Sequence, residues 1–230
     1  MASSGTFNYS LTVGEGIISA YERVQIRTPS IRQEHMVTAR RETNLLFTEW
    51  ANKQVNLWEV ILVSETLTES QATYDVDAKV VMILDAYISL DQGETTQTDR
   101  YITPVSRTDY ASYSNKSTEG FPTTFWFNRQ IEPTVTLWPV PDSNGPYTLN
   151  YYACTQMQDA NIAGAETPDI PYLWNDAFVA GLAHRLARVY KPELEPVRKA
   201  DAKEAWDIAA TQNTENVSLS LVPGLSGYYR

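Results

Sequence analysis

DIPYLWNDAFVAGLAHRLARVY, residues 169–190, is the stretch that decides the fold expected for this chain of 230 residues. Asp169 can cap a helix, and Pro171 suits its first turn. The residues that then recur at helical spacing are Trp174, Phe178, Gly181, Leu182, Arg185, Leu186 and Val189. Small residues make the same helix thin: Ala177, Ala180, Gly181, Ala183 and Ala187. The stretch therefore predicts a helix with one buried face, which the backbone of a second helix can approach closely.

Two helices are predicted before this one and one after it. Thr12 and Glu15 form a capping-box pattern, which starts a helix that ends near Gln25. The Thr28-Pro29-Ser30 segment starts a second, longer helix. Its apolar stripe consists of Met36, Ala39, Thr43, Leu46 and Trp50. A last helix is predicted from Leu194 to Thr211.

The helical period is absent between these two pairs of helices. From Val55 onward the residues are β-branched or aromatic and too densely apolar for a one-sided helix, which predicts a strand. Turn residues such as Asp142 to Pro146 separate the other candidate strands. These are Gln71 to Asp75, Val80 to Ser89, Thr123 to Asn128, Thr134 to Pro139 and Tyr147 to Gln156. A short helical turn is expected between Ser106 and Tyr113.

This order predicts an α+β fold. Residues 1–54 and 169–214 are expected to form one helical bundle, and residues 55–168 an inserted antiparallel β domain, either a sandwich or a small barrel. Two separate domains would give the same order. Residues 215–230 are expected to be an extended C-terminal arm, because Val217, Leu219 and Leu221 alternate with serines in a strand pattern. Such a strand can pair with its own sheet or with the sheet edge of another subunit.

Charge and composition exclude several classes of protein. The net charge is −10, and residues 66–168 hold 13 acidic and five basic residues, which argues against a grip on nucleic acid by this region. No stretch has the continuous apolar length of a membrane span, and the N-terminus lacks a signal-peptide pattern. We therefore expect synthesis in a cytosol and no membrane insertion. The single cysteine, Cys154, is expected to be a packed thiol.

No catalytic, cofactor-binding or metal-binding residue is predicted. His35 and His184 lack a second ligand at metal spacing, and Gly14-Glu15-Gly16 does not follow a strand as a phosphate loop would. Asp75 and Asp77 could share one strand face, but the rest of a calcium loop is missing.

Two weaker functional alternatives concern residues 119–127. Paired carboxylates for glycoside hydrolysis are defined by their separation in space, and Glu119 is the best candidate for one of them. The aromatic residues from Phe121 to Phe127 could stack on sugar rings or on bases. Strand alternation, however, places Phe125 and Phe127 on one face and Trp126 on the other, which favours a core on one side and an interface on the other.

Several segments together resemble a known family. They are ARRETNLLFTEWANKQVNLWEV (39–60), ITPVSRTDY (102–110), NKSTEGFPTTFWFNRQ (115–130), TLWPVPD (136–142), residues 169–190 and SLSLVPGL (218–225). From about Gln25 to Leu225 the chain resembles the head-to-tail adaptors of tailed phages, also called head completion, tail tubular A or DNA stabilisation proteins.

The resemblance implies a virion protein made in the host cytoplasm and located at the head-tail junction. It implies a homo-oligomeric ring, usually of twelve copies, beneath the portal protein. Such a ring extends the DNA channel, helps to retain packaged DNA and docks the tail nozzle or stopper, with tail fibres as a further candidate partner. The arm then supplies the candidate partner interface: Val217, Leu219, Leu221, Val222, Pro223, Tyr228 and Tyr229. A peptidoglycan-cleaving muramidase and a carbohydrate-binding module are the alternatives.

Overall fold

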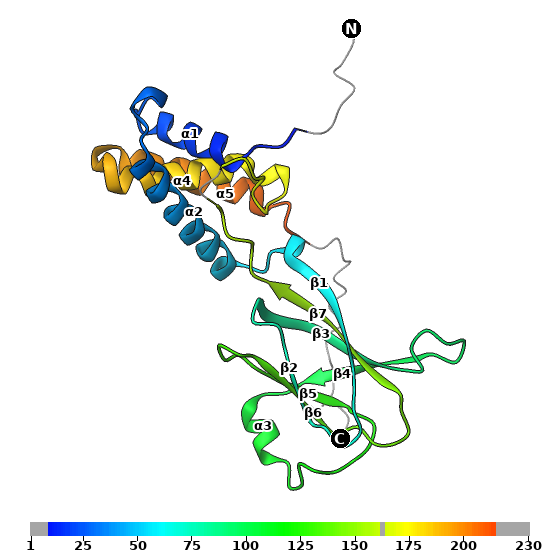
Figure 1. Ribbon diagram of the computed structural model, residues 1–230. Helices are drawn as coiled ribbons and strands as arrows, with labels where there is room; N and C mark the ends of the chain where they lie inside the picture. The colour runs from blue at the N-terminus through cyan, green and yellow to red at the C-terminus, as the bar shows by residue number, and fades with distance from the viewer. Residues whose placement is uncertain (1–8, 162–163, 215–230) are drawn as a thin grey trace, which may run out of the picture.

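The computed structural model describes residues 9–161 and 164–214. Within them the chain forms five α-helices and one seven-stranded sheet. Four of the helices gather at one end of the molecule and the sheet occupies the other (Figure 1). The mixed α+β class predicted from the sequence is confirmed. The predicted C-terminal arm and all seven candidate interface residues lie outside the described residues.

The helical layer consists of α1 (Val13–Arg23), α2 (Gln33–Lys53), α4 (Asn175–Tyr190) and α5 (Glu195–Ala210). Helices α1, α2 and α5 each pack against α4, which is the middle element of this layer (Figure 1). The predicted capping box starts α1, since the Thr12 hydroxyl accepts from the Glu15 amide and the Glu15 carboxylate accepts from the Thr12 amide. Two N-terminal signals act differently from the prediction. The Thr28–Ser30 segment is a separate 3₁₀ turn, and Asp169 accepts from the Gln158 amide instead of capping α4.

The core of the helical layer is built from the predicted faces of α2 and α4. Ala39, Thr43, Leu46 and Trp50 of α2 are buried, as are Phe178, Leu182 and Leu186 of α4. The small residues of α4 are buried too: Ala177, Ala180, Gly181, Ala183 and Ala187. Val189 was wrongly assigned to this face. It is 49% exposed, whereas the next residue, Tyr190, is the one in the last turn of α4 that packs against Tyr21 of α1.

The sheet has the strand order β1-β7-β3-β4-β5-β6-β2 and curls into a half-barrel (Figure 1). Its strands are β1 (Val60–Thr66), β2 (Thr73–Asp75), β3 (Val80–Leu90), β4 (Thr98–Pro104), β5 (Thr124–Asn128), β6 (Thr134–Trp138) and β7 (Tyr147–Thr155). A single curled sheet replaces the expected sandwich or barrel. It is also not wholly antiparallel, because β4 and β5 pair in parallel through Thr103–Thr124 and Pro104–Phe125.

Two strand predictions differ from the structure. Strand β4 was missed, since its residues are polar on both faces and all but Ile102 are exposed, so they give no alternating signal. The strand expected from Val55 begins only at Val60, because Leu57–Glu59 forms a 3₁₀ turn. That turn places Trp58 against Trp174, with ring centroids 4.8 Å apart, so tertiary packing outweighs local β propensity. The predicted helical turn is α3 (Arg107–Ser112).

The apolar core of the sheet is separate from that of the helical layer. Phe125 is buried in the sheet core, and Phe127 packs against it. Trp126 points to the opposite face, as predicted, where the ring of Tyr110 from α3 stacks on it with centroids 5.5 Å apart. The aromatic residues of this region therefore pack within the chain.

Candidate functional site

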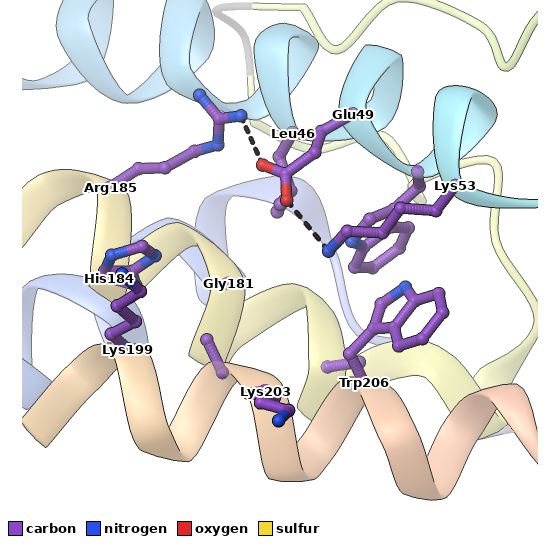
Figure 2. Close-up of a pocket in the computed structure, with 12 residues that line it drawn as sticks. Leu46, Glu49, Lys53, Gly181, His184, Arg185, Lys199, Lys203 and Trp206 are labelled. Carbon is purple, nitrogen blue, oxygen red and sulfur yellow. Dashed lines mark hydrogen bonds and ion pairs between the residues drawn. The ribbon is translucent and has the colours of Figure 1, made fainter.

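A groove of about 240 Å³ runs between α2 and α5, with α4 as its floor (Figure 2). Glu49 and Lys53 come from the last turns of α2, and Arg185 comes from α4. Helix α5 contributes Lys203 and Trp206. The groove is amphipathic. Cationic side chains lie at its edges, and aliphatic and indole groups form its interior.

The floor of the groove depends on the absence of a side chain at Gly181. A Cβ there would lie 3.0 Å from both methyl groups of Leu46. Glycine thus lets α2 approach α4 closely, which is the use predicted for the small residues of this helix. The small residues of α4 were therefore sufficient to predict its close packing with another helix. They did not predict the groove above this contact.

An ion-pair network joins the α2 wall of the groove to its α4 floor. The Glu49 carboxylate accepts from Arg185 at 2.6 Å and lies 2.8 Å from Lys53 Nζ (Figure 2). Partial burial of Glu49 opposes its charge, but the hydrogen bonds from Lys53 and Arg185 outweigh that effect and hold its pKa below the ordinary value. Arg185 also lies 3.5 Å from Glu42, so α2 and α4 are tied by charge as well as by packing.

Helix α5 brings unpaired positive charge to the same groove. Lys199 and Lys203 are exposed, and neither forms an ion pair within the described part of the chain. Lys53 Nζ lies 4.8 Å from the Trp206 ring centroid, close enough for a cation–π contact. Sequence reasoning missed these residues as a group, since they come from segments about 150 positions apart.

A second cluster lies where the helical layer meets the sheet. Glu59, only 7% exposed, accepts at 3.1 Å from the Thr155 hydroxyl through its carboxylate, and its backbone carbonyl accepts from the same hydroxyl. Burial, followed by the nearby negative charge of Asp169, raises the pKa of Glu59 to about 7. Asn213 fastens the end of the helical layer here, because its side chain donates to the Val55 carbonyl and accepts from the Leu57 amide.

The comparison with protein families decides the class. The family model described as SU10 adaptor protein matches residues 35–219. The chain belongs to the SU10 adaptor protein family. This is a family of phage head-to-tail adaptors, so the resemblance found in the sequence is confirmed. The match covers α2 through α5, and α1 lies before it. Among curated proteins, none matches the chain.

The chemical candidates of this adaptor are dispersed over the fold. His35 Nδ1 accepts from the Arg32 amide, and His184 pairs with Glu195 at 3.0 Å. Asp77 pairs with Lys79. Within residues 9–161 and 164–214, no group of three His, Cys, Asp or Glu side chains could hold a metal ion.

Two further candidates of the adaptor have local roles. Glu119 is exposed and accepts from the Ser70 hydroxyl at 2.6 Å, which ties its loop to the turn before β2. Cys154 is buried, and burial raises the pKa of its thiol, as expected for a packed cysteine. In the described part of the chain, no helix is long and apolar enough to span a membrane.

Proposed function

We propose that this adaptor assembles as a ring of twelve copies beneath the phage portal protein. The ring extends the DNA channel, helps to retain the packaged genome until ejection and docks the tail nozzle or stopper, with tail fibres as a further partner. In this proposal residues 1–54 and 169–214 form the frame of the ring, and residues 55–168 form an inserted β domain. Residues 215–230 form an arm that contacts a neighbour or the portal. The family match over residues 35–219 is the observation that carries the proposal.

The distribution of exposed apolar residues in the helical layer supports a ring. Helix α2 exposes Val37 and Leu45, and helix α5 exposes Val197 and Ile208. A closed ring is built from head-to-tail contacts, in which one surface of a subunit meets a different surface of the next. The exposed apolar side chains of α2 and α5 could provide the two different surfaces of such a head-to-tail contact.

Charge supports the role proposed for the channel. The segment between the helices has a net charge of −8 over residues 66–168, where 13 acidic residues outnumber five basic ones. A ring through which DNA slides does not need clustered lysine and arginine side chains that bind phosphates tightly. The acidic segment therefore suits a surface that DNA passes or that keeps the ring soluble.

The interaction with the portal is the experiment that tests the proposal. Purified adaptor would be mixed with portal rings from the same phage and sedimented. The proposal predicts that the adaptor co-sediments with the portal at one copy per portal subunit. Sedimentation of the portal alone, with a folded adaptor left in the supernatant, would contradict it.

A further inference from the structure

The outer edge of strand β1 has no neighbouring strand among the described residues. Among the described residues β1 is the end strand of the sheet, and β7 is its only neighbour. It is seven residues long, whereas β2 at the opposite edge has three. Exposed edge strands are usually protected by lysine, proline, a bulge or short length. The VILVSET sequence of β1 has no lysine or proline, and its pairing with β7 is regular from Val60 to Thr66.

The hydrogen-bond register identifies the groups that face outward. The Leu67 amide donates to the Tyr147 carbonyl at 2.9 Å, directly beyond the Thr66–Thr148 pair. In an antiparallel pair every second residue directs both its N–H and its C=O toward the partner. Val63 and Glu65 therefore bond to β7. The amides that face away from β7 and have no acceptor in the described chain are Leu62, Ser64 and Thr66.

The last described residues of the helical layer lie beside the start of β1. Asn213 is bound to Val55 and Leu57, so the chain leaves α5 beside the start of β1 (Figure 1). Two residues lie between Thr214 and Val217, and two lie between Leu57 and Val60. At roughly 3.3 Å per residue, residues 217–222 extend about 20 Å and β1 about 23 Å.

The alternation in residues 217–222 is that of a strand, as pairing with β1 requires. Val63 packs against the sheet core, and Ile61 and Glu65 share its face. Ser64 and Thr66 lie on the opposite face, together with Val60 and Leu62. Val217, Leu219 and Leu221 can extend the face of Ile61 and Val63 while Ser218 and Ser220 extend the face of Ser64 and Thr66, and Pro223 has no N–H to extend the pairing.

We propose that residues 217–222 pair with β1 of the same chain as an eighth, parallel strand in the free protein. This pairing covers an edge that would otherwise favour aggregation. The proposal is independent of the virion role, and the segment would have to leave β1 before it could contact a partner.

Amide hydrogen exchange measured by NMR tests this proposal in the full chain. We expect the Leu62, Ser64 and Thr66 amides to exchange at least about tenfold faster in a Leu219→Pro variant than in the wild type. Val63 and Glu65, which bond to β7, are internal controls and should not change. A Tyr228→Ala variant, altered beyond the pairing segment, should keep the wild-type rates.

Two outcomes would overturn the proposal. Equal exchange of the three edge amides in the wild type and in Leu219→Pro would mean that no strand covers the edge. Protection that falls on tenfold dilution would identify the occupant as a second copy, since pairing within one chain does not depend on concentration.

Discussion

Gly181 of α4 lies so close to Leu46 of α2 that a Cβ on the glycine would sit 3.0 Å from both leucine methyl groups. This contact sets the distance between α4, the floor of the groove, and α2, one of its two walls. Both methyl groups belong to the flexible end of one side chain, so a single added methyl group can be accommodated by a small shift of Leu46. A charged side chain cannot be accommodated in the same way.

Replacement of Gly181 by glutamate should lower the free energy of unfolding by about 3 kcal/mol or more, because it inserts a charge into a packed interface. Gly181→Ala should change it by no more than about 1 kcal/mol, since the strain is offset by better helix propensity. Urea denaturation measures both. The control is Ala200→Glu on the exposed face of α5, with an expected change of about 0.5 kcal/mol or less. Equal effects at positions 181 and 200 would refute the close contact.

Gly16 makes the corresponding contact between α1 and α4. A Cβ at this position would overlap Cε1 of Phe178, a fully buried ring. We expect Gly16→Val to destabilise the chain by roughly 2–4 kcal/mol through overpacking. Phe178→Leu should make room, so the double variant should be at least about 1 kcal/mol more stable than the sum of the single changes predicts. Strict additivity in this double-mutant cycle would show that the two residues do not compete for space.

Several elements were predictable because their signals are local. The Thr12–Glu15 capping box and the stripe from Ala39 to Trp50 lie within a few turns of chain, and both were identified correctly. Other features depend on partners distant in sequence. The contact of Gly16 with Phe178 and the pairing of β4 with β3 and β5 arise only after the helices and strands have assembled.

The candidate site was less predictable than the fold for the same reason. Glu59 and Thr155 are separated by 96 positions, and nothing in either local sequence indicates a buried carboxylate at the junction. The interface residues predicted on the arm stay a prediction, since they lie outside the described residues. The family was identified from the sequence resemblance. Each resembling segment is weakly specific alone, but the set of segments is specific when taken together.

Glu59 should make stability depend on pH. Its pKa of about 7 in the folded chain exceeds the ordinary value of 4.5, so the folded state binds more protons between these values. Its contribution to the free energy of unfolding is therefore fully present below about pH 4.5 and is lost as the pH rises through 7. We expect Glu59→Gln to be about 1–3 kcal/mol more stable than the wild type at pH 8, and the difference to vanish near pH 4.

Urea denaturation at several pH values measures the difference in free energy of unfolding between the two proteins. The other titratable groups are the same in both proteins, so their contributions cancel in this difference. Glu204→Gln, at an exposed position of α5, is the matched control and should differ from the wild type by about 0.5 kcal/mol or less at every pH. A Glu59→Gln variant that is less stable than the wild type at pH 8 would refute the raised pKa.

Removal of residues from Val217 onward should separate folding from assembly. The shortened chain should keep its cooperative unfolding, because the residues described before 215 already form two extensive apolar cores. It should lose stable docking to its ring neighbour or to the portal, as measured by co-sedimentation. A shortened chain that still assembles on the portal would exclude these residues as the partner interface.

The position of this adaptor in the particle is tested most directly by cryo-electron microscopy of the head-tail junction. We expect a ring of twelve copies between the portal and the tail, in which helical layers of adjacent copies contact each other. Density for this chain elsewhere in the virion, or a junction without it, would contradict the proposed role.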